Sequence, residues 1–335
     1  MEAHEVHRTY PAGQSRSPPM RLLILGAGAT GGYFGGRLAQ AGTDVTFLVR
    51  PARAALLRER GLRIRSALGD ADLQVDTVTA AALPALAAAR PFDLVLLSCK
   101  AYDLDDAIAA VAPAVDAGAC VLPILNGLLH YPVLEARLGR HRVYGGLCFI
   151  SATVDAAGDI VHMGRAASLT WGARAGNVDT AVLAALEAAC THARIDHLYA
   201  PDIAQAQWIK FTFLATLAAG TCLMRASIGE IVAGEHGEAF MAGLHDECLA
   251  IAEAEGQPVP RDEIRRARAQ LTHAGSPVTA SMLRDLEAGR RVEALQIVGD
   301  MVHRAHRAGL AATRLEAAWV HLQAYEAARG VRGRG

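Results

Sequence analysis

The stretch Leu22-Leu23-Ile24-Leu25-Gly26-Ala27-Gly28-Ala29-Thr30-Gly31 decides the fold of this chain. Four apolar residues, typical of a buried strand, lead into a G-x-G-x-x-G loop, and a helical pattern follows as far as Ala41. Gly26 allows the tight turn, Gly28 lets a pyrophosphate approach the backbone, and Gly31 lets the helix pack close to the strand. Free N–H groups at the helix start can hold phosphates. The stretch therefore predicts a dinucleotide-binding loop over residues 26–31.

The end of the second strand carries arginine. This strand begins at Asp44 and leads to Val49-Arg50-Pro51-Ala52-Arg53. NAD enzymes usually place an acidic residue here to hold the ribose hydroxyls, whereas arginine accommodates a 2′-phosphate. We therefore expect NADP(H) as the cofactor, with Arg50 contacting the 2′-phosphate and Arg53 as a candidate helper. A surface arginine without a ligand is the alternative.

Short apolar runs alternate with Ala/Leu-rich helical stretches from Arg21 to about Leu138. Continuous apolar runs are expected for parallel strands covered on both faces, so the pattern predicts an α/β Rossmann-type doubly wound sheet. Short β-like pieces between Val143 and Trp171 are expected to add strands that close this domain. The four principal strands that we expect are Arg21–Leu25, Asp44–Val49, Phe92–Ser98 and Ala119–Leu125.

The pattern becomes helical after Pro201 and stays so to Ala328, with many Ala and Leu residues and few β-branched ones. We expect an NADP-binding domain over residues 20–200 and an all-α helical substrate and dimerisation domain over residues 201–328. The active site is expected in the cleft between them. Residues 1–19 lack the apolar centre of a signal peptide, and we interpret them as a disordered extension.

Composition excludes several classes of protein. The net charge of −1 gives none of the basic excess that nucleic acids or membrane surfaces select, and the longest apolar run, Phe211–Met224, is too short to span a bilayer. The six cysteines form no CxxC pair, and the histidines are equally scattered. We therefore expect reduced thiols in a cytoplasmic protein, and no metal. The apolar helical half is compatible with a homodimer.

Three polar residues stand in apolar surroundings. Lys100 and Asn126 follow buried strands, at the edge where open α/β sheets bind ligands. Lys210 lies in a helical stretch with almost no other charge, where burial would lower the pKa of its ammonium and make it a better proton donor. Ketone reduction needs a hydride on carbon and a proton on oxygen, so Lys210 is a candidate acid. The alternatives are an ordinary Asn-Gly turn and a lysine that extends to solvent.

Taken in order, these segments resemble the ketopantoate reductase (2-dehydropantoate 2-reductase) family over nearly all of residues 20–325. The resemblance implies NADPH-dependent reduction of 2-dehydropantoate to pantoate, a step toward pantothenate and coenzyme A. The matching pieces are Leu25–Gly36, Arg50, Lys100, Asn126-Gly127, Trp208–Lys210, Ser281–Asp285, and Glu293 followed by Gly299.

The resemblance also implies a role for each of these residues. Residues 26–31 would cradle the pyrophosphate, and Arg50 would take the 2′-phosphate. Lys210 would be the catalytic acid, and Asn126, Lys210 and Ser281 would bind substrate. Lys100 and Asn126 would line the cleft, and Glu293 would contact the ribose side of the cofactor and hold the Lys210 ammonium.

The chain departs from the family pattern at positions where the family often carries asparagine, which here are Leu214, Ala218 and Val278. A lost hydrogen-bond partner for a substrate hydroxyl costs on the order of 1–3 kcal/mol. The alternative function is therefore a paralogous NADP-dependent reductase of a less polar 2-oxo or 3-oxo acid. A non-catalytic NADP sensor is a further alternative, against which Lys210 and Glu293 argue. Candidate replacements for the asparagines are Thr212, Thr216, Thr221 and Thr279.

Overall fold

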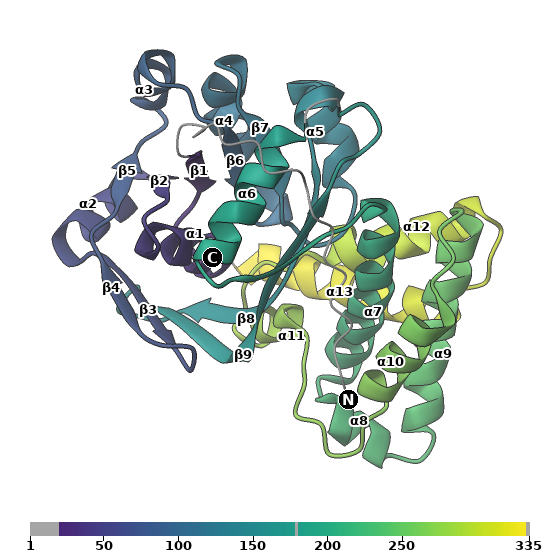
Figure 1. Cartoon of the computed structure of the whole chain (residues 1–335). Helices are drawn as coiled ribbons and strands as arrows, with labels where there is room; N and C mark the ends of the chain where they lie inside the picture. Colours follow the sequence, from purple (N-terminus) through teal and green to yellow (C-terminus); the bar gives the residue numbers. More distant parts are fainter. Residues whose placement is uncertain (1–19, 178–179, 333–335) are drawn as a thin grey trace.

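A parallel sheet of five strands forms the first half of the molecule (Figure 1). The computed structural model describes residues 20–177 and 180–332, so the interpretation of residues 1–19 lies outside the described residues. The strand order β5-β2-β1-β6-β7 places β1 at the centre and puts a topological switch point between β1 and β6. The expected α/β Rossmann-type fold is confirmed: the first predicted strand has the expected bounds, and the other three are shorter by one or two residues at an end. The strands are β1 Arg21–Leu25, β2 Asp44–Leu48, β5 Asp76–Val78, β6 Leu94–Leu97 and β7 Cys120–Pro123.

A second sheet of five strands lies beside the first. The extra strands expected between Val143 and Trp171 form its long antiparallel hairpin, β8 with β9. We did not expect β3, β4 and β10 to join them, because these strands are short and β3 and β10 pair with a strand that is distant in the sequence. β9 pairs in parallel with β3 at one end and with β10 at the other. The strands are β3 Leu62–Ser66, β4 Ala71–Leu73, β8 Gly145–Val154, β9 Ile160–Gly172 and β10 Asp196–Tyr199.

Helix α1 (Ala29–Gln40) packs between the two sheets, and its glycines make this possible. A Cβ on Gly35 would lie 2.8 Å from Ile24 in the first sheet, and a Cβ on Gly36 would lie 2.8 Å from Ile64 in the second. The glycine-rich sequence that follows the loop therefore serves close packing on two sides of one helix. The other helices of this half are α2 Pro51–Arg60, α3 Leu83–Ala89, α4 Leu104–Asp116, α5 His130–Leu138 and α6 Ala181–His192.

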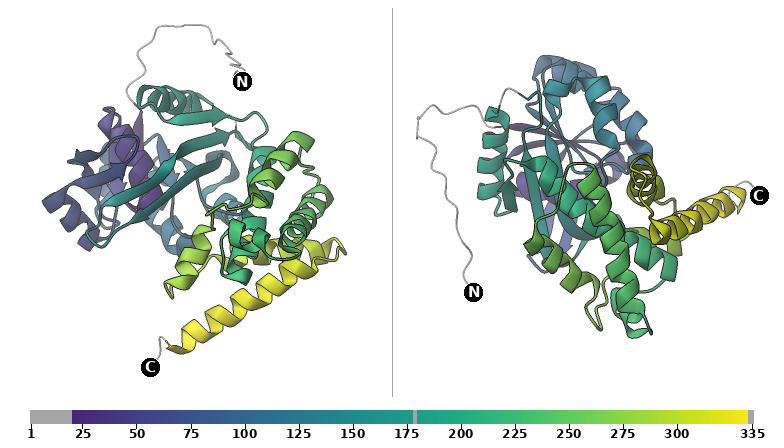
Figure 2. Two further views of the ribbon diagram at one scale, coloured as in Figure 1. Left: turned by 90° about the horizontal axis from the view of Figure 1, so that it is seen from below. Right: turned by 90° about the vertical axis from the view of Figure 1, so that its right-hand side faces the viewer.

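The chain is helical from Ile203 onward, as the sequence predicts. Helix α7 (Ile203–Met224) is buried on most sides at the centre of this half, which explains why its sequence is apolar all round. Helix α13 extends from the body of the molecule (Figure 2). No helix in the described ranges is long and apolar enough to cross a membrane. The remaining helices are α8 Ile228–Ala233, α9 Gly237–Ala254, α10 Arg261–Leu271, α11 Ser281–Glu287, a π-helix at Leu295–Gly299, α12 Asp300–Arg307 and α13 Thr313–Arg332.

Candidate active site

The glycine loop has the geometry that its spacing predicts. Gly26 has a φ of +85°, in the left-handed region that favours glycine. A Cβ on Gly31 would lie 2.2 Å from the Ser98 hydroxyl, so only glycine lets α1 approach the strands here. Gly28 is exposed, and a Cβ on it would meet nothing within 4 Å. The space over Gly28 at the start of α1 is therefore open to a phosphate.

The two arginines after β2 differ in their contacts. Arg50 is exposed, and its side chain makes no hydrogen bond or ion pair with any other described residue. Arg53 is half-buried, and its Nη2 donates to the carbonyls of Ala27 and Gly158, each at 3.0 Å. Burial lowers the pKa of Arg53. Our expectation of Arg53 as a helper at the phosphate is therefore revised, because this guanidinium already braces the glycine loop against the β8–β9 turn.

Lys210 and Asn126 come from the two halves of the chain and meet. The Lys210 ammonium on α7 donates to Asn126 Oδ1 at 3.2 Å, and it lies 5.4 Å from the centre of the Phe149 ring on β8. Burial lowers the pKa of Lys210 below its ordinary value of 10.5, while the interactions with Cys148 and Glu293 oppose the shift. The structure thus places a half-buried ammonium of lowered pKa beside the side-chain amide of Asn126.

Lys210 also lines a small cavity of about 10 Å³, which has room for roughly one water molecule. The Asn126-Gly127 turn forms part of its wall, and Gly127 has a φ of +78°. A Cβ on Gly127 would lie 2.2 Å from the carbonyl oxygen of Gln296, so this turn packs directly on the π-helix. Apart from Lys210 and Gln207, the lining side chains are apolar. The lining residues are Leu125, Gly127, Leu128, Gly146, Leu147, Gln207, Lys210, Phe211 and Leu214.

Lys100 forms a second link between the two halves. Its ammonium lies 2.9 Å from an Asp285 carboxylate oxygen and 3.4 Å from Glu293, and the Ala101 N–H donates to Glu293 at 3.0 Å. Burial lowers the pKa of Lys100, but the two carboxylates outweigh it and the pKa is raised overall. We expected Glu293 to hold the Lys210 ammonium. The structure instead pairs Glu293 directly with Lys100, and its charge reaches Lys210 only at longer range.

Ser281 is exposed at the first position of α11. It lies four residues before Asp285, so the two side chains share one face of the helix. The contact between Asp285 and Lys100 therefore brings the Ser281 face toward the end of β6, on the side of the predicted site.

The positions where this chain departs from the family pattern have different surroundings. Leu214 lines the pocket, Ala218 is fully buried in the helical core, and Val278 is exposed. The threonines on α7 that we considered as replacements donate their hydroxyl hydrogens to carbonyls of the same helix. The hydroxyls of Thr212, Thr216 and Thr221 lie 2.7–3.0 Å from these backbone oxygens. Our expectation that one of these three meets a substrate hydroxyl is therefore revised.

Sequence reasoning missed Gln207, which lines the pocket together with Lys210. It lies three residues before Lys210 and is almost fully buried. A polar side chain in the apolar start of α7 was the available signal. Its partners lie 33 to 76 residues away along the chain, beyond the reach of any local pattern.

Comparison with known proteins agrees with this architecture. The family profile described as "Ketopantoate reductase PanE/ApbA" matches residues 22–176, and its C-terminal counterpart matches residues 202–326. An uncharacterized oxidoreductase of Bacillus subtilis, YkpB, is 34% identical over 308 residues, covering 92% of this chain and 99% of that protein. A 2-dehydropantoate 2-reductase of Halobacterium salinarum is 30% identical over 291 residues, covering 85% and 92%.

A solved structure shows the same likeness in three dimensions. A PanE/ApbA family ketopantoate reductase from Ralstonia eutropha is 27% identical, with a TM-score of 0.81 over 93% of this chain and 100% of that one. The fold, the match of both halves of the chain to the two family profiles, and these relatives identify an oxidoreductase. The chain belongs to the ketopantoate reductase family.

Proposed function

We propose that this chain is an NADPH-dependent reductase of 2-oxo acids, with 2-dehydropantoate (ketopantoate) as the leading candidate substrate and pantoate as its product. One observation carries the proposal: the Lys210 ammonium is held by Asn126, just after the parallel strand β7, and Lys210 lines a small cavity there together with residues of both halves. Ligands of open α/β sheets bind at this edge. In this proposal residues 20–200 bind the cofactor, and residues 201–328 bind substrate and support a dimer.

The residues of the first half fit NADPH. Open space over Gly28, the free N–H groups at the start of α1 and the unpaired, exposed Arg50 can accommodate the pyrophosphate and the 2′-phosphate. Lys100, Asn126 and Glu293 would line the nicotinamide and ribose side. When bound, NADPH supplies the hydride for the carbonyl carbon.

Lys210 would supply the proton. As the carbonyl oxygen gains negative charge, an ammonium of lowered pKa both stabilises that charge and transfers a proton to the oxygen. Asn126 accepts from Lys210 through Oδ1, which leaves its Nδ2 donors for the substrate or the cofactor. Ser281 would bind the substrate from the α11 side.

The proposal is tested by the loss of NADPH absorbance with purified protein and a panel of 2-oxo acids. The panel pairs ketopantoate with 3,3-dimethyl-2-oxobutanoate, which differs only in lacking the hydroxyl, and adds unbranched and aromatic members. We expect turnover with at least one branched 2-oxo acid. No NADPH oxidation with any member would contradict the proposal and favour the NADP sensor.

A second candidate function is reduction of a less polar 2-oxo acid. The pocket favours it, since Leu214 lines the wall and the Gln207 amide is occupied by protein partners. The threonine hydroxyls of α7 are likewise turned to their own backbone. In the pocket described, a substrate hydroxyl would therefore meet mostly apolar side chains.

We predict that Leu214→Asn shifts preference toward the hydroxylated substrate. An amide oxygen at this wall can accept a hydrogen bond from the ketopantoate hydroxyl. One such hydrogen bond is worth about 1 kcal/mol, or roughly fivefold to tenfold in kcat/KM. The measurement is the ratio of kcat/KM for ketopantoate to that for 3,3-dimethyl-2-oxobutanoate. Leu214→Met is the matched control and should leave the ratio unchanged. If the ratio does not move in Leu214→Asn, this wall does not face the hydroxyl position.

A further inference from the structure

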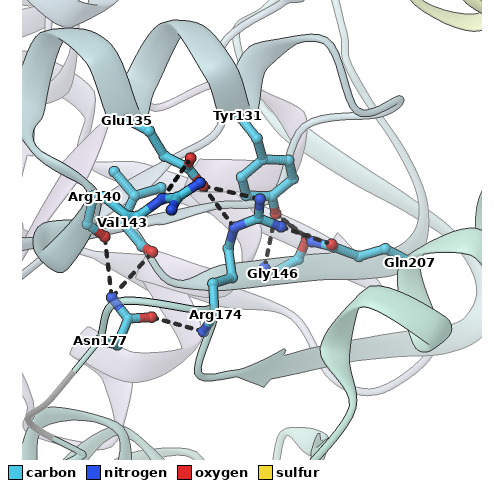
Figure 3. A network of polar contacts seen from close by, with 8 residues as sticks. All are labelled: Tyr131, Glu135, Arg140, Val143, Gly146, Arg174, Asn177 and Gln207. Carbon is cyan, nitrogen blue, oxygen red and sulfur yellow. Dashed lines mark hydrogen bonds and ion pairs between the residues drawn. The ribbon is translucent and has the colours of Figure 1, made fainter.

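We propose that Gln207 is a positioning residue for Lys210, acting through a largely buried polar network that joins the two halves of the chain; this inference rests on the proposed role of Lys210. Figure 3 draws this network, and the members used in the argument below are Tyr131, Glu135, Gly146, Arg174 and Gln207. Gln207 is its member on α7, and the others come from α5, β8 and the segment after β9.

The contacts of Gln207 fix the orientation of its amide. The Nε2 group donates to the Tyr131 hydroxyl and to the Gly146 carbonyl, the latter at 3.2 Å. The Oε1 atom accepts from Arg174 Nη1 at 3.4 Å. Because an arginine can only donate, Oε1 must face Arg174 and Nε2 must face Gly146. A buried amide with partners at both ends resists rotation and displacement.

Arg174 is itself held in place from several directions. Its Nε and Nη2 donate to one Glu135 carboxylate oxygen at 3.1 and 2.9 Å, and its guanidinium lies 3.9 Å from the centre of the Tyr131 ring. Its backbone N–H donates to Asn177 Oδ1 at 2.7 Å. The Tyr131 hydroxyl also accepts from the Gly146 N–H at 3.0 Å. The network therefore presents a rigid surface to α7.

The Gln207 amide lies next to Lys210 on α7 and also contacts β8, the strand that faces Lys210. Gln207 precedes Lys210 by three residues, so the two lie on adjoining positions of one helix face. Gly146 stands near the start of β8, and the following residues Leu147 and Phe149 lie against the pocket and the Lys210 ammonium. By binding Gly146, Gln207 fixes the distance between α7 and β8 at the point where the proton donor must meet a substrate.

The first test is Gln207→Leu, which keeps the volume and removes the hydrogen bonds. A displaced acid slows proton transfer, and misplacement by about 1 Å can cost up to about 100-fold. We expect kcat for 2-oxo acid reduction to fall roughly fivefold to tenfold, with the Kd for NADPH unchanged in fluorescence titration. The matched control is Gln205→Leu, on the same turn of α7 and without a side-chain hydrogen bond among the described residues. It should retain wild-type kcat.

A double-variant cycle separates positioning from general support of the fold. If Gln207 acts through Lys210, adding Gln207→Leu to Lys210→Ala produces no further loss of the residual rate. An unchanged kcat in Gln207→Leu overturns the inference, and so does a loss that persists undiminished in the Lys210→Ala background. A wild-type chain that reduces no 2-oxo acid would overturn the proposed function itself, which is a distinguishable result.

A second variant covers the case in which Gln207→Leu does not fold. Arg174→Met removes the donor to Gln207 Oε1 from a side chain that is about a quarter exposed, so the fold should tolerate it better. We expect kcat to fall in the same direction by roughly threefold, again without a change in NADPH binding. Wild-type kcat in a folded Arg174→Met protein would overturn the positioning role of the network.

Discussion

The Lys210→Ala variant is expected to bind NADPH as the wild-type chain does, while kcat for 2-oxo acid reduction falls roughly 10²- to 10⁴-fold. This range is the usual contribution of a positioned general acid. Lys210 lies on α7, and neither the glycine loop nor Arg50 is among the residues that line its pocket, so the phosphate contacts should survive its removal. The measurement pairs NADPH fluorescence titration with steady-state kinetics. A parallel loss of binding and turnover would instead assign Lys210 to cofactor binding.

The pH profile provides a second readout of the same variant. The ammonium is the donor, so activity is present below its pKa and is lost as the pH rises through that value. Because burial lowers the pKa of Lys210, we expect the alkaline limb of kcat to lie below 10.5, and to disappear in Lys210→Ala. An alkaline limb that Lys210→Ala leaves in place would belong to another group.

The lowered pKa also predicts the sign of the stability change. The folded chain binds the Lys210 proton less tightly than the unfolded chain, so stability due to this group rises with pH between the folded pKa and 10.5. Below that window the buried ammonium opposes folding. Lys210→Met, which keeps the aliphatic length, should therefore melt at no lower temperature than wild type near neutral pH. A loss of activity in this variant can then be assigned to chemistry.

Local patterns predicted the parts of the fold that depend on neighbouring residues. The run Leu22–Leu25, the glycine spacing after it, and the switch to helix after Pro201 each reflect a periodicity or turn that needs no distant partner. The sequence predicted the strands β1, β2, β6 and β7 and a doubly wound sheet, but their order in the sheet comes from the structure. The second sheet was only half predicted, because the pairing of β3 with β9 joins residues about 96 positions apart.

For the candidate site, too, local patterns predicted the positions of single residues but not their long-range contacts. The sequence places Lys100, Asn126 and Lys210 at strand ends and a helix start, but it does not say which carboxylate meets which lysine. Glu293 lies 193 residues from Lys100, and only the packing of the π-helix segment decides that it pairs there. Arg53 was a candidate helper of Arg50 on the same short segment until its contact with the β8–β9 turn assigned it a structural role.

The threonines of α7 show an error that the sequence could have avoided. Thr212, Thr216 and Thr221 lie inside a long helix, where a hydroxyl commonly donates to the carbonyl three or four residues earlier. Such a hydroxyl has already used its donor and can only accept from a ligand, and all three are buried here. Helix position therefore argued against these residues as substitutes for asparagine, which can donate and accept. None of these three threonines lines the pocket, so none of them replaces there the asparagine that the family often has at the position of Leu214.

Arg50→Ala should raise the KM for NADPH roughly 10- to 100-fold and leave the KM for NADH nearly unchanged. A charge-assisted hydrogen bond to a phosphate is worth about 1.5–3 kcal/mol, and the 2′-phosphate is the only group that distinguishes the two cofactors. Because Arg50 is exposed and unpaired within the described chain, its removal should not destabilise the fold. The measurement is KM for each cofactor at saturating 2-oxo acid.

The adjacent arginine provides the matched control. Arg53 braces Ala27 in the glycine loop against Gly158, and this loop would hold the pyrophosphate that NADH and NADPH share. Arg53→Ala should therefore weaken both cofactors by similar factors, whereas Arg50→Ala should weaken NADPH alone. Equal effects of Arg50→Ala on the two cofactors would remove the 2′-phosphate role from Arg50. A selective effect of Arg53→Ala would return that role to the neighbouring guanidinium, which would then have to release the Ala27 and Gly158 carbonyls to bind the phosphate.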